Sequence, residues 1–271
     1  MMRIKGSIGF TIKNHSSMYL PLLALLIVGC FSCARPTYYP QLDLSYFSKE
    51  QLVEELKQKN ERVSSIKGIA RISVTTPYDK TSFRQITIAR APDLIYLEAL
   101  SPIGTTLGIL KCNGSTVEVA YRNERLLFEK NEQFDVSLLY PGIPITARAD
   151  DLANLLLARI PHVGDLRADD VELSSERGLL VLKTVNENIK DGYAPESIWL
   201  DPISHSVTKV SLRMDDGKRA TYRFDDYEEL AAGIYFPLSI ELEVEGFSLK
   251  IRFEPDIEVN GSTDEVFPPR E

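Results

Sequence analysis

The chain has 271 residues, a formal net charge of −8 and 44% hydrophobic residues. A chain of this length can bury one substantial core, and all-β barrels or sandwiches of more than 200 residues commonly form a single domain. The acidic balance argues against nucleic acid as a partner, because nucleic-acid-binding proteins carry a basic stripe or patch.

The first 29 residues have the pattern of a secretory signal. They contain Arg3, Lys5 and Lys13 but no Asp or Glu, and an apolar stretch follows from residue 18. The stretch reaches Cys30 after too few residues to cross a bilayer, since a spanning helix needs roughly 20. We therefore predict a signal peptide at residues 1–29, and removing its three positive charges changes the formal charge from −8 to −11.

The segment Ile27-Val28-Gly29-Cys30 predicts a lipoprotein cleavage site, at which the Cys30 thiol is acylated. The alternative is an ordinary secretory signal with incidental cysteines. We expect residues 30–47 to form a lipidated tether with little fixed structure. Because Phe31 rather than Asp follows the cysteine, we expect the anchor to lie in the outer membrane, with the domain facing the periplasm. The remaining Cys33 and Cys112 do not suggest a disulfide framework.

Residues 48–271 are predicted to form one domain. Ser48 and Gln51 resemble a capping box that begins a helix ending near residue 62. A second helix is predicted at 149–159, with acidic residues in its first turn and Pro161 beyond its end. Apolar and polar residues alternate elsewhere and predict strands at 66–75, 83–91, 94–100, 105–112, 116–121, 125–130, 179–186, 193–201, 207–214, 220–227, 234–245 and 247–259.

So many consecutive strands with one apolar face predict a mainly β fold, a strongly curved antiparallel sheet or an incomplete barrel of about 11 strands. Two helices are too few to cover such a sheet from outside, so we expect them across its concave opening. Strand parity predicts that a hydrophobic cavity on the concave side is lined by Trp199, Tyr222, Phe224, Phe236, Ile240 and Phe253. The alternative is a plain hydrophobic core.

The sequence offers no recognisable catalytic or metal-binding constellation. The predicted mature chain has two histidines, His162 and His205, which we interpret as solvated loop residues because neither has a partner at a known metal or triad spacing. Paired acids such as Asp225-Asp226 are interpreted as strand-end and turn residues. We expect no enzyme activity, no cofactor and no metal.

Three segments resemble the LolB-like outer-membrane lipoprotein receptors, within the LolA/LolB-like superfamily of lipoprotein carriers and receptors. They are an aliphatic strand, Ser-Pro-Ile-Gly turn and second strand at 97–107, a Gly-hydrophobic-Pro turn at 141–145, and a helix ending in proline at 151–161. Residues 198–202, 224–227 and 233–237 are similar to patterns of the wider superfamily.

This resemblance implies an unclosed barrel around a hydrophobic cavity, with helices as a lid. It also implies that the protein accepts the acyl chains of lipoproteins from a periplasmic carrier and helps to insert them into the outer membrane. We expect a monomer. Family receptors engage the membrane through an exposed leucine in an early loop, and the first such loop here, at 76–81, offers Tyr78 instead. Two alternatives are binding of lipid or another hydrophobic ligand, and a structural or assembly lipoprotein with a filled core.

Overall fold

The computed structural model describes residues 41–121, 124–129, 132–140, 142–143, 146–185, 194–214 and 217–267. The predicted signal peptide, Cys30 and residues 30–40 lie outside the described residues. Residues 41–271 form one compact unit. It begins before residue 48, because Leu44 and Phe47, in and just after the 3-10 turn η2 (Leu44–Tyr46), pack against the core.

A 14-stranded antiparallel sheet dominates the described residues. Its strands are β1 (Ser65–Thr75), β2 (Lys80–Arg90), β3 (Leu94–Leu100), β4 (Thr106–Asn113), β5 (Thr116–Tyr121), β6 (Glu124–Glu129), β9 (Val171–Glu176), β10 (Leu179–Thr184), β11 (Ala194–Leu200), β12 (Val207–Arg213), β13 (Arg219–Ala231), β14 (Ile234–Val244), β15 (Phe247–Phe253) and β16 (Glu258–Val259). Strands β7 (Phe134–Asp135) and β8 (Thr146–Ala147) form a separate pair.

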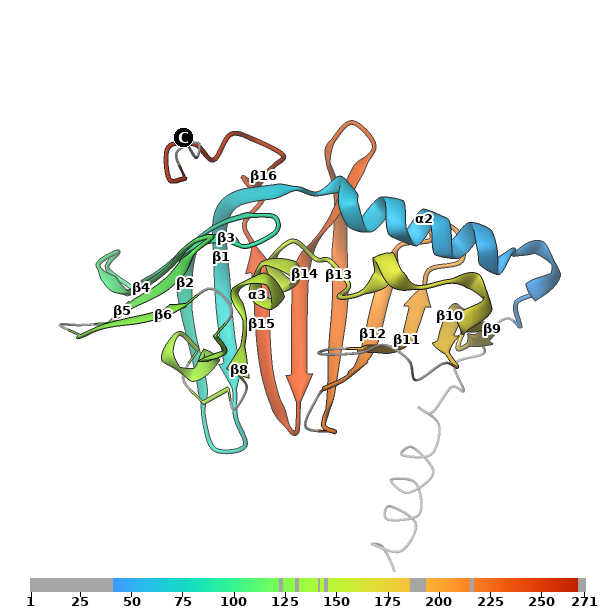
Figure 1. The fold of residues 1–271 in the computed structure, drawn as a ribbon, viewed down its shortest axis with the longest axis horizontal. Helices are drawn as coiled ribbons and strands as arrows, with labels where there is room; N and C mark the ends of the chain where they lie inside the picture. The colour runs from blue at the N-terminus through green and yellow to red at the C-terminus, as the bar shows by residue number, and fades with distance from the viewer. Residues whose placement is uncertain are drawn as a thin grey trace, which may run out of the picture. The chain divides into compact units, whose positions relative to one another are not determined.

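Two meanders make up the large sheet (Figure 1). The order is β6-β5-β4-β3-β2-β1-β15-β14-β13-β12-β11-β10-β9, with β16 beside β1. The two meanders meet where β1 pairs with β15, for example at Ile72 opposite Ile251. Within the described residues the end strands β6 and β9 do not pair with each other, so the sheet is open, as predicted.

Alternation along the strands produces one buried face. In β14 the side chains of Phe236, Leu238, Ile240, Leu242 and Val244 are all buried. Their neighbours Glu241 and Glu243 are partly exposed on the other face, where Glu243 pairs with Arg223 of β13 at 2.6 Å. Most of these buried side chains belong to a single hydrophobic cluster, which also includes residues from both helices.

Helix α2 (Lys49–Arg62) agrees closely with its prediction. The Ser48 hydroxyl caps it by accepting a hydrogen bond from the Gln51 backbone N–H at 3.2 Å. Leu52, Val53 and Leu56 form its buried face. The helix runs along one end of the strands (Figure 1), as expected for an element across the concave opening.

Helix α3 (Ala149–Leu156) is shorter than the predicted 149–159. The chain turns at Ala158, whose φ is +53°, so Arg159 lies outside the helix. Its guanidinium instead donates two hydrogen bonds, of 3.0 and 2.7 Å, to the carbonyl of Val63 just after α2. The segment after α3 is therefore hydrogen-bonded to the residue that follows α2.

Helix α3 fills the middle of the half-barrel. Its residues Leu152, Ala153, Leu155 and Leu156 are all buried, and it contacts β2 and β3. Against β13, β14 and β15 it leaves a void of only about 20 Å³. The centre of the concave side is therefore packed core, and larger hollows lie to either side of it.

Candidate functional site

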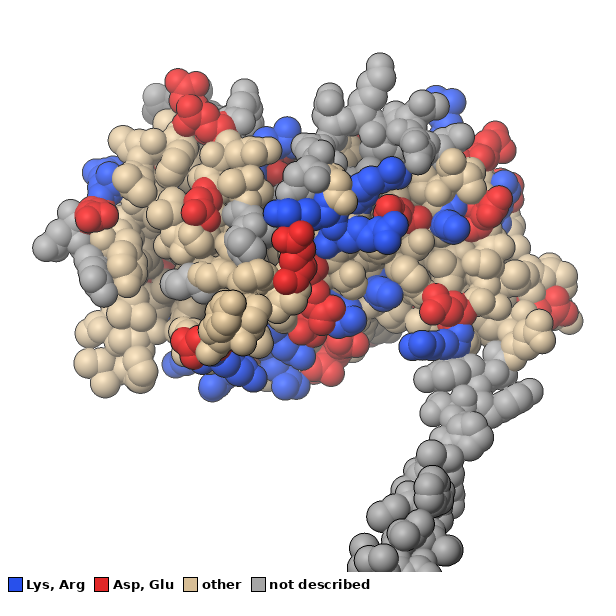
Figure 2. Space-filling view, turned by 90° about the horizontal axis from the view of Figure 1, so that it is seen from below, with Lys and Arg blue, Asp and Glu red and all other residues tan. Residues whose placement is uncertain are grey.

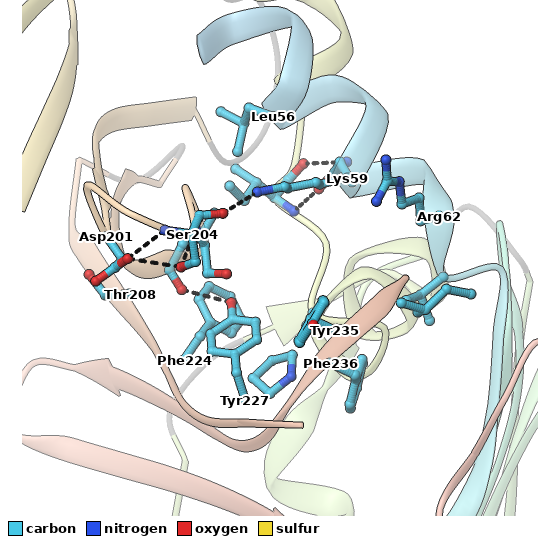
Figure 3. A pocket seen from close by; sticks show the side chains of 18 of the residues that line it. Leu56, Lys59, Arg62, Asp201, Ser204, Thr208, Phe224, Tyr227, Tyr235 and Phe236 are labelled. Atoms are coloured by element: carbon cyan, nitrogen blue, oxygen red, sulfur yellow. Dashed lines mark hydrogen bonds between the residues drawn. The ribbon is translucent and has the colours of Figure 1, made fainter. Parts of the chain in front are cut away.

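A cavity of about 680 Å³ lies beneath the C-terminal half of α2. Its walls come from α2, from the segment after α3, from the loop between β11 and β12, and from β13 and β14. This volume falls in the range of small-molecule sites, which is roughly 300–1,000 Å³. The lining residues labelled in Figure 3 are Leu56, Lys59, Arg62, Asp201, Ser204, Thr208, Phe224, Tyr227, Tyr235 and Phe236.

The floor of this cavity is apolar. Phe224 of β13 and Phe236 of β14 are almost fully buried and project inward from neighbouring strands. Leu56 projects from α2 above them, because it lies on the buried face of that amphipathic helix. Val63 and Ile160 complete the apolar lining. The alternation of the strands and the periodicity of the helix thus aim hydrophobic side chains into the same space.

The rim of the cavity is polar and ties α2 to the loops. The Lys59 ammonium donates to the Ser204 carbonyl at 2.6 Å, and the Arg62 guanidinium donates to the Gly233 carbonyl at 3.2 Å (Figure 3). Burial lowers the pKa of Lys59, because removing the ammonium from water disfavours its charged form. The Tyr227 hydroxyl donates to the Val207 carbonyl at 2.7 Å, so its polar end is satisfied beside the apolar floor.

Asp201 organises the loop that carries Ser204. Its carboxylate accepts hydrogen bonds from the backbone N–H of Ile203 at 3.0 Å and of Ser204 at 2.7 Å. Burial acts to raise the pKa of Asp201, but these hydrogen bonds outweigh it and hold the pKa below its usual value. The loop is therefore a preorganised wall of the cavity.

His205 is not the solvated loop residue that we expected. It is half-buried, its Nδ1 lies 2.7 Å from the Glu55 carboxylate of α2, and its ring meets Phe47 edge-on at 6.1 Å. The hydrogen bond to His205 holds the pKa of Glu55 below its usual value. This pair joins the loop to α2. Among the described residues, no group of three or more His, Cys, Asp or Glu is arranged to hold a metal ion.

A second cavity, of about 410 Å³, lies at the β2–β6 side of the concave face. We call it the wing cavity. Ala99 and Gly108 face each other across β3 and β4, and their small size leaves room beside Phe83 and Val119. Leu138 and Leu139, at the end of the turn η3 (Val136–Leu138) and just after it, cover it. It shares no lining residue with the cavity under α2.

The structure separates the six residues that were predicted to line one cavity. Phe224 and Phe236 line the cavity under α2, whereas Tyr222 borders only the 20 Å³ void beside α3. Ile240 and Phe253 are buried in the core, where Phe253 packs edge-on against Phe236 with ring centroids 5.6 Å apart. Neither the cavity under α2, nor the void beside α3, nor the wing cavity is lined by all six residues.

The placement predicted for Trp199 is wrong. Its neighbours Ile198 and Leu200 are buried, so Trp199 lies on the opposite, outer face of β11. There its indole N–H donates to Glu176 at 2.9 Å, and the Lys209 ammonium lies 4.0 Å from its ring centroid. Three consecutive apolar residues make the parity of this strand ambiguous in the sequence.

Two early loops present exposed apolar side chains. Tyr78, in the turn between β1 and β2, is 97% exposed, and Ile103, in the Ser-Pro-Ile-Gly turn between β3 and β4, is 86% exposed. Ile103 is an exposed aliphatic residue in a later turn than the loop at 76–81, to which the family resemblance pointed. The sequence indicates this exposure, because an aliphatic residue between Pro102 and Gly104 lies in a four-residue turn, where its side chain does not reach the core. Leu107 on β4 and Leu127 on β6 are also exposed.

Charged side chains of both signs gather over the middle of the face seen from below (Figure 2). Among the described residues, no helix is both long enough and apolar enough to cross a membrane.

The fold of this protein is an open antiparallel half-barrel with a helix over an apolar cavity. It is similar to a LolA superfamily protein from Nitrosomonas europaea, with a TM-score of 0.51 and 13% identity over 82% of this chain and 98% of that one. A putative outer membrane lipoprotein-sorting protein domain from Vibrio parahaemolyticus gives 0.50 and 11% over 80% and 94%. A DUF1329 family protein from Desulfovibrio piger gives 0.51 and 12% over 81% and 95%.

No protein-family model and no curated protein sequence matches the chain. The structural likeness nevertheless confirms the fold expected from the sequence. The chain has an open-barrel fold similar to that of the LolA superfamily protein.

Proposed function

We propose that this protein is a lipid-anchored envelope protein that takes acyl chains into the cavity under α2 and helps to insert lipoproteins into the outer membrane. The observation that carries the proposal is the 680 Å³ cavity between α2 and the concave face, with its floor of Phe224 and Phe236. The fold shared with a LolA superfamily protein and a lipoprotein-sorting domain supports it.

The physical need for such a cavity is the cost of exposing acyl chains to water. Each methylene contributes ~0.8 kcal/mol when it is buried, so one long chain costs on the order of 10 kcal/mol to expose. An apolar cavity on a protein tethered through Cys30 would hold a chain beside the membrane that receives it. A periplasmic carrier would deliver that chain. Transfer of this kind requires no covalent step and no cofactor.

Ile103 is our candidate for the membrane-contacting residue, in place of Tyr78. It projects from the β3–β4 turn, and Leu107 at the start of β4 is exposed as well. Exposed aliphatic side chains at a turn have the composition of a surface that enters the boundary of a bilayer. Cys30 supplies the permanent anchor in this proposal, and Ile103 a reversible contact.

Depletion of the protein in its own bacterium tests the lipoprotein role. If it acts as an acceptor, other lipoproteins accumulate in the periplasm or the inner membrane when it is removed, and a copy whose cavity is narrowed by Thr208→Phe restores their sorting less well than the unaltered copy. Thr208 lines the cavity. Thr221→Phe, on the outer face of β13, is the matched control and should restore it. Normal sorting after depletion contradicts the acceptor role.

A second candidate is a structural or assembly lipoprotein with a filled interior. The packing of α3 against β13, β14 and β15, with a void of only about 20 Å³, favours it for the centre of the domain. The two candidates differ in ligand binding, because a filled domain has no saturable site for a fatty acid.

A further inference from the structure

The cavity under α2 has an uneven distribution of charge at its rim. Lys59 and Arg62 lie one helical turn apart on α2 and extend over the apolar floor (Figure 3). Each donates a hydrogen bond to a backbone carbonyl, of Ser204 and Gly233 respectively, and no described carboxylate forms an ion pair with either. An ammonium has three N–H donors and a guanidinium has five, so both groups can bind a further acceptor.

The carboxylates near this rim are largely engaged elsewhere. Asp201 accepts hydrogen bonds from its own loop, and Asp226 pairs with Arg252 at 3.0 Å. Glu55 is bound to His205. Asp225, which is exposed, is the remaining carboxylate among the lining residues. Asp226 is therefore paired with a cation outside the cavity, and among the described residues neither Asp201 nor Asp225 forms an ion pair with Lys59 or Arg62.

Desolvation strengthens the effect of this arrangement. Lys59 has a lowered pKa because it is partly buried, so an anion placed beside it would restore favourable interactions that water no longer supplies. Hydrogen bonds between charged partners are about twice as strong as neutral ones, and they are stronger still in a low-dielectric site.

We propose that the cavity under α2 binds an amphiphile whose anionic headgroup, a carboxylate or a phosphate, is held by Lys59 and Arg62 while its hydrocarbon chain lies on Phe224 and Phe236. This inference rests on the part of the proposed function by which the cavity takes an acyl chain, and it names an anionic amphiphile as a ligand in addition to lipoproteins, whose glyceryl thioether head carries no anion. A free fatty acid or a lysophospholipid has this chemistry. A neutral diglyceride head does not use the two cations.

Displacement of a neutral fluorescent probe, N-phenyl-1-naphthylamine, tests the proposal in the Cys30→Ser protein. The competitors share a 16-carbon chain and differ in the head: hexadecanoate, 1-hexadecanoyl lysophosphatidic acid, hexadecanol and hexadecyltrimethylammonium, each below its critical micelle concentration. We expect hexadecanoate or the lysophosphatidic acid to displace the probe at concentrations about tenfold lower than hexadecanol, the effect of one charge-assisted hydrogen bond. Whichever anion binds better identifies a fatty acid or a phospholipid as the source.

The variants assign this preference to residues. Lys59→Met combined with Arg62→Met should lower the affinity for the anions to that for hexadecanol and leave hexadecanol unchanged. Lys49→Met combined with Lys57→Met removes the same charge from α2 outside the cavity and should have no effect. Lys59→Arg combined with Arg62→Lys should keep the preference, which separates a charge effect from misfolding.

Equal displacement by acid and alcohol, or an anion preference that survives Lys59→Met with Arg62→Met, would overturn the headgroup proposal and leave the acyl-binding function in place. Failure of every amphiphile to displace the probe would overturn both.

Discussion

Asn60 and Ile160 form two reciprocal hydrogen bonds that join α2 to the segment after α3. The Ile160 backbone N–H donates to the Asn60 side-chain oxygen at 2.6 Å, and the Asn60 amide donates to the Ile160 carbonyl at 3.3 Å. The Asn60 carboxamide thus bonds the backbone N–H and C=O of Ile160, as the backbone of a neighbouring strand would. Together with Arg159, which donates to Val63, this pair holds the wall of the cavity against the helix above it.

Asn60→Leu should lower the free energy of unfolding by about 2 kcal/mol, because the buried Ile160 N–H loses its partner. It should also speed the release of a bound fatty acid, since α2 would separate from the cavity wall more readily. Chemical denaturation and stopped-flow displacement measure the two effects. Gln58→Leu, which removes an exposed bond to Glu54 on the same helix, is the control. Unchanged stability and release would show that the pair does not hold the wall.

Ile103→Asp should weaken the association of the unlipidated protein with phospholipid vesicles by about tenfold, because the favourable burial of the isoleucine is lost and a carboxylate enters the apolar part of a bilayer unfavourably. Vesicle flotation measures this. Ile203→Asp is a matched control, since Ile203 is 91% exposed in the β11–β12 loop. Equal losses in the two variants would argue against a specific role of the β3–β4 turn.

Trp199 is the only tryptophan, so its fluorescence reports on one position. Because it lies on the outer face beside Lys209 and Glu176, iodide or acrylamide should quench it readily, and its emission should not shift when a fatty acid binds. Trp199→Phe should bind ligand like the unaltered protein. An emission shift to shorter wavelength on ligand binding would instead place this side chain in the cavity.

Binding of an anionic amphiphile should weaken at alkaline pH, and at a lower pH than the ordinary lysine pKa of 10.5. Burial favours the neutral amine of Lys59, so the ammonium is lost as pH rises through the lowered pKa, and the charge that holds the anion is lost with it. The charged groups that act on this ammonium or share its cavity are Glu55, Arg62, Asp201, Asp225 and Asp226.

Lys59→Arg provides the contrast for this pH dependence, because a guanidinium stays charged throughout the accessible range. Affinity for hexadecanoate in that variant should stay constant as the pH rises toward the ordinary lysine pKa of 10.5, whereas the affinity of the unaltered protein falls. The same decline in both proteins would show that Lys59 is not the titrating group.

The sequence predicted the strands well because each one has a buried and a wet face. In β14 and β15 the alternation alone places Phe236, Ile240 and Phe253 correctly on the buried side. Strand β9 escaped prediction, since Glu172, Ser174 and Ser175 leave it too polar to show an alternation. Strand β9 is at the edge of the sheet, where fewer side chains pack against the core, so fewer of them need to be apolar.

The site was less predictable because it depends on contacts between distant segments. Local patterns do not show that β1 pairs with β15, or that α3 enters the half-barrel instead of covering it. That packing converts the single predicted cavity into two hollows on either side of a filled centre. Lys59 and Arg62 looked like the ordinary wet face of α2, and only the position of the β11–β12 and β13–β14 loops brings them over a cavity.

A binding titration of the Cys30→Ser protein, which lacks the proposed lipid attachment site, with a fluorescent fatty acid tests acyl-chain binding most directly. We expect saturable binding that Thr208→Phe weakens, because the larger ring intrudes into the cavity under α2, and that Thr221→Phe leaves intact. Absence of saturable binding, or binding that Thr208→Phe does not change, would contradict acyl-chain binding in this cavity.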